Sequence, residues 1–78
     1  MITLKITGTD LNFGGDKTIT LKGSNIFTIL PKYLETIEDL YVEDYTMTTP
    51  FGEGGNKGMN SGAYLNQYIE ELTGMDLR

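Results

Sequence analysis

The stretch ITLKITGTDLNFGGDKTITLK, residues 2–22, holds two runs in which apolar and polar side chains alternate. The apolar positions of the first run are Ile2, Leu4 and Ile6, and residues 17–22 repeat the pattern. A period of two is typical of a strand with one buried face. The glycine pair at 14–15 supplies the positive φ that a reversing turn needs. The stretch therefore predicts an antiparallel hairpin, with a bulge or a wide loop where the apolar phase shifts between Gly8 and Leu11.

A helix is predicted next, over residues 28–40. Its apolar side chains recur every three or four residues, at Leu30, Tyr33, Leu34, Ile37, Leu40 and Tyr41. Pro31 fits best in the first turn, where its missing N–H is not needed, and Ser24, Asn25 or Thr28 can cap the helix.

The remainder of the chain predicts one more strand, a loop and a second helix. Residues 41–49 are rich in tyrosine, valine and threonine, as strands are, although Glu43 and Asp44 interrupt the alternation. Residues 50–62 contain five glycines and are expected to form a mobile loop. The last helix is marked by Tyr64, Leu65, Tyr68, Ile69 and Leu72, with Asn60 or Ser61 as its cap and Gly74 at its end.

These elements predict one α+β domain over residues 1–78. Their order is ββαβα, and both helices are expected to cover one face of an antiparallel sheet of about three strands. The other face of the sheet is left open in this arrangement.

The composition excludes several kinds of chemistry. Six basic and eleven acidic residues leave a formal charge of −5, and the chain has neither cysteine nor histidine. Zinc sites, thiol nucleophiles and serine–histidine triads all need one of these residues. Carboxylate pairs that act as acid and base need a deep cleft, which so short a chain seldom forms. We therefore expect no enzyme activity and no cofactor.

The charge and the hydropathy pattern also bear on location and partners. The first residues alternate and do not form a basic region followed by an apolar block, so we expect no signal peptide and a cytoplasmic protein. No apolar run is long enough to cross a bilayer. The acidic balance disfavours direct binding to nucleic acid or to anionic lipid.

The candidate partner-binding residues form an acidic stretch. They are Glu35, Glu38, Asp39, Glu43 and Asp44, with no lysine or arginine between Tyr33 and Asn56. Glu38 and Asp39 are expected in the last turn of their helix, where the negative end of the macrodipole destabilises a carboxylate by about 0.3–1 kcal/mol. Charge in a position that reduces stability suggests that it serves a partner.

An acidic surface of this kind can occupy a channel built for a phosphate backbone. Tyr41 and Tyr45 lie among the carboxylates and can contact arginine side chains, and Phe51 and Met59 can act as apolar anchors. In size and charge the chain resembles the small acidic inhibitors that phages direct against bacterial defence, the anti-CRISPR proteins among them. The resemblance implies a viral protein that blocks a basic, nucleic-acid-binding complex of the host.

Two alternatives remain open. In the first, the glycine-rich segment binds a nucleotide or another small anion through Gly54, Gly55, Lys57 and Ser61, although its spacing matches neither the Walker loop nor the dinucleotide fingerprint. In the second, the open sheet face or an edge strand joins copies of the chain into a homodimer or a larger assembly.

Overall fold

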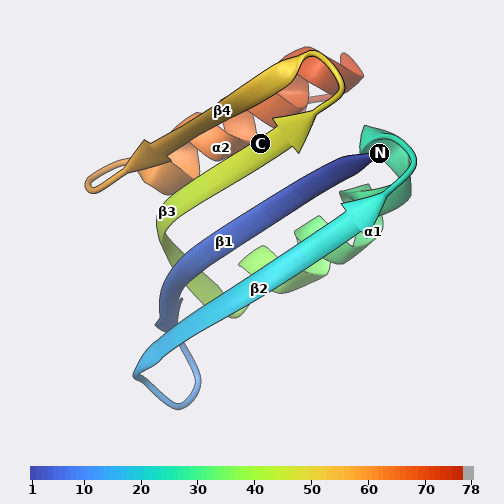
Figure 1. Cartoon of the computed structure of the whole chain (residues 1–78). Coiled ribbons are helices and arrows are strands. Elements are labelled where there is room, and N and C mark those ends of the chain that lie inside the picture. The colour runs from blue at the N-terminus through green and yellow to red at the C-terminus, as the bar shows by residue number, and fades with distance from the viewer. Residues whose placement is uncertain (77–78) are drawn as a thin grey trace.

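A single antiparallel sheet backed by two helices makes up the structure, a computed structural model that describes residues 1–76. Its elements in chain order are β1 (Ile2–Asp10), β2 (Asp16–Gly23), α1 (Ile26–Ile37), β3 (Leu40–Thr49), β4 (Gly52–Lys57) and α2 (Ser61–Thr73). The strands lie in the order β2-β1-β3-β4, and both helices cover the same face (Figure 1). The α+β class and the two-layer arrangement are as predicted, but the sheet has four strands.

The predicted hairpin is formed by β1 and β2, in register from Ile2 opposite Gly23 to Thr9 opposite Asp16. The carboxylate of Asp10 accepts the backbone N–H groups of Asn12, at 2.8 Å, and Phe13, at 3.2 Å. These two bonds, helped by nearby Lys17, hold the pKa of Asp10 below its ordinary value. The turn is therefore fixed by a side chain as well as by its two glycines, whose φ angles are positive.

A bulge interrupts the pairing of β1 with β3. Thr7 lies opposite Asp44 and Gly8 lies opposite Val42, so Glu43 is the extra residue. The hairpin of β1 and β2 itself pairs without a shift up to Thr9 opposite Asp16, so of the two alternatives expected between Gly8 and Leu11 the loop is present, over residues 11–15, and the bulge lies instead in β3. As a result Val42 and Tyr45 both face the helices, although they are three positions apart, and Glu43 and Asp44 lie on the open face.

Helix α1 begins and ends two to three residues earlier than the range 28–40. The side chain of Asn25 caps it by accepting the N–H groups of Phe27 and Thr28. Pro31 consequently lies inside the helix, not in its first turn. Glu38 is the C-cap, so Glu38 and Asp39 lie just beyond the last turn and not within it.

The glycine-rich segment is not one long loop, because residues 52–57 form β4 and pair with β3. The prediction failed because glycine is unfavourable in strands when judged from sequence alone. Here the ring of Tyr68 in α2 lies 3.2 Å from the position that a Cβ of Gly54 would occupy. The ring thus covers the bare backbone of the glycine, as aromatic side chains do elsewhere in sheets.

The core lies between the sheet and the helices. Its fully buried members are Leu4, Ile6, Tyr33, Met47, Leu65 and Ile69, with Ser61 beside them. The opposite face of the sheet is uncovered in Figure 1 and is dominated by threonine and charged side chains. Within residues 1–76 no helix is both long and apolar enough to cross a membrane.

Candidate functional site

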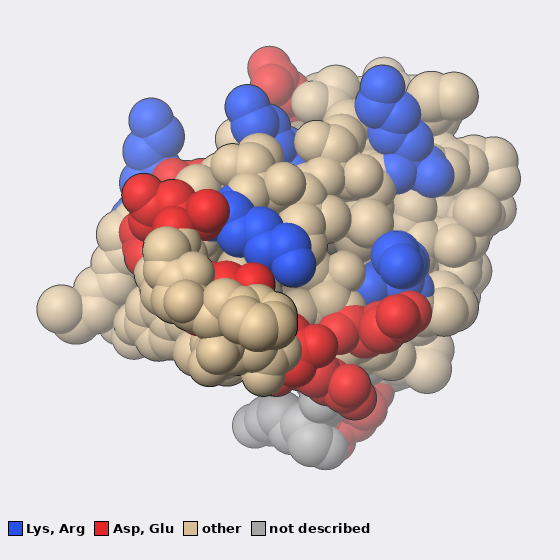
Figure 2. Space-filling view, turned by 90° about the horizontal axis from the view of Figure 1, so that it is seen from below, with Lys and Arg blue, Asp and Glu red and all other residues tan. Residues whose placement is uncertain are grey.

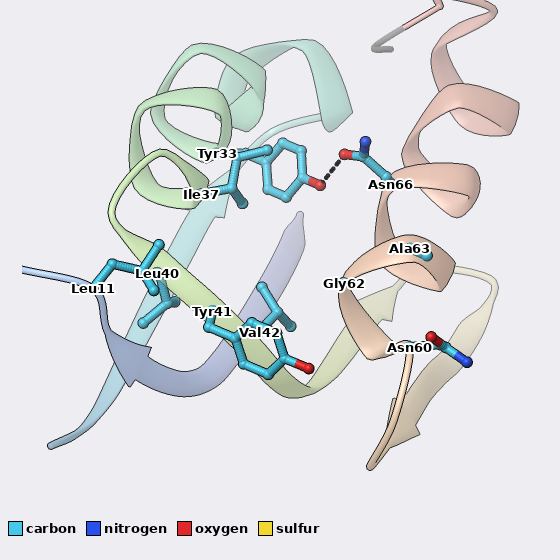
Figure 3. Close-up of a pocket in the computed structure, with 10 residues that line it drawn as sticks. All are labelled: Leu11, Tyr33, Ile37, Leu40, Tyr41, Val42, Asn60, Gly62, Ala63 and Asn66. Carbon is cyan, nitrogen blue, oxygen red and sulfur yellow. Dashed lines mark hydrogen bonds between the residues drawn. The ribbon is translucent and has the colours of Figure 1, made fainter. Parts of the chain in front are cut away.

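A hollow of about 350 Å³ lies between the two helices, at the end of the sheet where β3 begins (Figure 3). Its lining comes from the C-terminal half of α1, the first residues of β3 and the first turns of α2. The lining residues are Leu11, Tyr33, Ile37, Leu40, Tyr41, Val42, Asn60, Gly62, Ala63 and Asn66. The hollow is mainly apolar, with polar atoms of tyrosine and asparagine at its edges.

A hydrogen bond joins the two helices above this hollow. The hydroxyl of Tyr33 in α1 donates to Oδ1 of Asn66 in α2, as the dashed line in Figure 3 shows. Tyr33 is almost fully buried. Burial, together with the negative charge of Glu70 and the nearby Tyr45, raises the pKa of Tyr33 well above its ordinary value of 10.0. Tyr33 is therefore neutral in the folded protein and fixes the spacing of the two walls.

This raised pKa predicts a loss of stability in alkaline solution. The unfolded chain releases the Tyr33 proton above about pH 10, whereas the folded chain keeps it. The ionisation of Tyr33 should therefore leave the free energy of unfolding unchanged below about pH 10 and should lower it as the pH rises further. Tyr33→Phe should cost about 1 kcal/mol at neutral pH, because Asn66 loses its donor, and should make the alkaline fall shallower.

The measurement is urea unfolding between pH 8 and pH 12, a range chosen around the ordinary tyrosine value of roughly 10. Tyr64→Phe is the matched control, since Tyr64 lies on the same helix as Asn66 and is half exposed. If the free energy of unfolding fell equally steeply with pH in Tyr33→Phe and in the wild type, Tyr33 would not be the group with the raised pKa.

The structure divides the acidic stretch between the two faces of the sheet. Glu38 and Asp39 form the turn between α1 and β3 and follow the lining residue Ile37 in the chain, and Asp39 lines a separate hollow together with Lys17 and Lys32. Glu35 projects from α1 toward Lys32, with Oε1 3.9 Å from Nζ. Glu43 and Asp44 lie on the open face, where Glu43 accepts a hydrogen bond from Thr9. The view in Figure 2 accordingly shows carboxylates in separate groups with lysines beside them, not one continuous acidic surface.

The aromatic and apolar candidates are also dispersed. Tyr41 is 58% exposed and lines the hollow, whereas Tyr45 is only 6% exposed and belongs to the core. Burial, with Tyr68 nearby, raises the pKa of Tyr45. Phe51 is almost fully exposed, but it lies in the turn between β3 and β4, at the far end of β3 from the hollow. Met59 is exposed in the connection from β4 to α2, next to the lining residue Asn60.

The residues proposed to bind phosphate serve other purposes in the fold. Gly54 and Gly55 belong to β4, and Lys57 ends that strand with an exposed side chain. Ser61 is fully buried, and its hydroxyl donates to the carbonyl of Gly58 at 2.8 Å and accepts Nδ2 of Asn56 at 3.0 Å. These four residues therefore do not form an open cradle of N–H groups.

Sequence reasoning missed several residues that build the hollow. The pattern places Leu11 only in the hairpin turn, yet its N–H donates to the carbonyl of Asp39 at 2.9 Å and places its side chain at the wall. Asn66 gives no signal in sequence, because a polar residue on a helix is ordinarily solvent-exposed. Gly62 and Ala63 could have been noticed as small residues at the start of a helix, where they leave space beside a neighbour.

The chain matches no protein-family model, no curated protein and no solved structure. Among the described residues, no group of three or more histidine, cysteine or acidic side chains is placed to hold a metal ion. A proposal for the function therefore has to start from the hollow and from the turn between α1 and β3.

Proposed function

We propose that the chain is a non-catalytic interaction protein that binds a basic surface of a protein partner through the α1–β3 turn and the adjoining hollow. The partner is a nucleic-acid-binding complex of a host cell, and binding blocks its nucleic-acid site, as an anti-CRISPR-type inhibitor encoded by a phage does. The observation that carries the proposal is that two carboxylates stand in the chain between two residues that line an apolar hollow. Ile37 and Leu40 line the hollow, and Glu38 and Asp39 lie between them in the chain.

This combination suits an arginine side chain. Its aliphatic stem can lie along apolar surface while its guanidinium binds carboxylate oxygens with two parallel hydrogen bonds. The exposed ring of Tyr41 beside the hollow offers a face on which the guanidinium can stack. The contact surface thus consists of Glu38, Asp39 and Tyr41, and Glu43 and Asp44, which do not line the hollow, lie outside it.

The charge at the end of α1 supports a role in binding. The last turn of α1 has no basic residue, and the carboxylate of Glu38 sits at the C-cap, where the macrodipole is negative. Reversing this charge therefore should not harm the fold. It removes a repulsion of roughly 0.3–1 kcal/mol at an exposed site.

The test compares the wild type with the double variant E38K/D39K in capture experiments from nuclease-treated bacterial lysate. We expect the wild type to retain a basic protein at low salt and to release it at high salt, because exposed ion pairs are screened. We expect E38K/D39K to lose that protein while unfolding at the same temperature or slightly higher. Added DNA or RNA should displace the captured protein from the wild type, because the two compete for one site.

Glu71→Lys is the matched control, because Glu71 occupies the last turn of the other helix and does not line the hollow. It carries the same sign of charge change and should leave capture nearly intact. Equal losses in both variants would show that only net charge matters, and unfolding of E38K/D39K would show that the two acids are structural. Capture of no protein, with a nucleotide carried through purification, would also overturn the proposal.

A further inference from the structure

Strand β4 leaves one edge of the sheet unpaired. It is the last strand in the order β2-β1-β3-β4, and none of residues 1–76 pairs with its outer side. Hollows of about 360 and 560 Å³ adjoin it, and Gly55 and Asn56 line both of them. An uncovered strand edge offers a row of N–H and C=O groups to another strand. The question is which strand fits it.

The hydrogen bonds of β4 show which groups point outward. The N–H of Gly58 donates to the carbonyl of Glu43 at 2.9 Å, so Gly58 bonds inward to β3. Inward and outward residues alternate along an antiparallel strand. Glu53, Gly55 and Lys57 therefore direct their N–H and C=O groups to the free edge, and their side-chain positions lie on the open face.

We infer that the partner of this edge is a second copy of the chain, with the two β4 strands antiparallel about a two-fold axis at Gly55. In this register Gly55 faces Gly55 of the partner subunit, and Glu53 faces Lys57 of the partner subunit. Each of these pairs joins outward-pointing residues, so each exchanges two backbone hydrogen bonds. The two-fold axis produces the Glu53–Lys57 pair twice, and opposite charges directly across a sheet are stabilising.

The helix layer is compatible with this pairing. Helix α2 contacts both β3 and β4, so it lies over the space between them. Strands are roughly 4.8 Å apart, which puts the two α2 helices of the dimer about 10 Å apart, close to the usual distance between packed helices. Tyr64 and Tyr68 lie on the side of α2 that lines the hollow next to β4. The dimer would therefore cover the half-exposed ring of Tyr64.

The other edge strand, β2, is unfavourable for pairing with β2 of a second copy. If two β2 strands paired antiparallel about a two-fold axis at Ile19, Asp16 would face Lys22 of the partner subunit. In the same register, however, Lys17 would face Leu21 of the partner subunit. Lys17 is on the helix side, where it lines a hollow with Asp39 and forms an ion pair with Asp10 at 3.8 Å. A charged residue directed inward at an edge strand opposes sheet extension. The corresponding positions of β4 are Gly54 and Asn56, which carry no charge.

The test uses sedimentation equilibrium of the wild type, E53K, K57E and an equimolar mixture of the two variants. The wild type should show a mass of twice 8.7 kDa at high concentration. Each single variant places like charges opposite each other at both positions and should dimerise about thirtyfold more weakly. The mixture should restore dimers without any change in the monomer's fold, since the two lysines of the E53K strand then face the two glutamates of the K57E strand.

The matched controls are D16K and K22E on β2, alone and mixed, which should dimerise like the wild type. Hydrogen exchange gives a second readout, because the amides of Glu53, Gly55 and Lys57 should become protected as concentration rises while those of Thr18 and Thr20 stay exchangeable. A monomer at all concentrations, dimers that persist in E53K and K57E, or dimers lost in the β2 variants would each overturn the inference. The inference does not depend on the proposed function.

Discussion

We expect Gly8→Ala to lower the free energy of unfolding by about 3 kcal/mol or more, the larger end of overpacking effects. At the bulge β1 and β3 come so close that a Cβ on Gly8 would lie 2.0 Å from the carbonyl oxygen of Tyr41 and 2.8 Å from its carbonyl carbon. Both atoms are backbone, so no side chain can rotate away. The strands must separate, which breaks the pairing of Gly8 with Val42 and of Thr9 with Tyr41.

The measurement is urea unfolding followed by circular dichroism, with the slope of the transition used to verify that the unfolded state is unchanged. A domain of this size has little stability in reserve, so a substantial fraction of the variant should be unfolded without denaturant. Gly62→Ala is the control, because a Cβ there meets only the side chain of Val42, at 3.6 Å. In helix α2 this change should stabilise by about 0.5–1 kcal/mol. Equal effects of the two substitutions would contradict the close approach at the bulge.

The same bulge shows which parts of the fold can be predicted from sequence. The alternation in residues 2–22 predicted the hairpin, because one buried face imposes a period of two. The interruption at Glu43 and Asp44 was visible as a defect in the third strand, and the structure shows that it is the bulge itself. That this bulge lies opposite Gly8 of β1 could not be predicted, because strand register depends on contacts between residues far apart in the chain.

Strand β4 shows what could not be predicted. Its conformation depends on Tyr68 covering Gly54 and on pairing with β3, neither of which leaves a local pattern. The candidate site was predicted only in part for a related reason. Clustering along the sequence suggested one acidic surface, but alternation and the bulge direct Glu43 and Asp44 away from Glu38 and Asp39. The hollow itself joins segments from Leu11 to Asn66, which only the tertiary structure brings together.

We expect Leu65→Ala to cost about 3–4 kcal/mol, within the range for large-to-small changes at fully buried leucines. Helix α2 is attached to the sheet through few side chains, since its buried residues are Ser61, Leu65 and Ile69. Leu65 is fully buried, so its truncation leaves a cavity between α2 and the sheet. Loosening α2 also removes the cover of Gly54 by Tyr68, so β4 should lose protection against hydrogen exchange together with the helix.

Leu72→Ala provides the comparison, because Leu72 lies on the same helix but is 41% exposed, and its truncation should cost less than about 1 kcal/mol. The same pair tests the site. The first turns of α2 form one wall of the hollow, so Leu65→Ala should weaken capture of a basic partner even under conditions in which the variant is mostly folded. Leu72→Ala should not. If both variants lost stability equally, α2 would not be held by the buried face that the structure assigns to it. If Leu65→Ala retained full capture of the partner while the amides of α2 exchanged freely with solvent, the hollow would not be part of the binding surface.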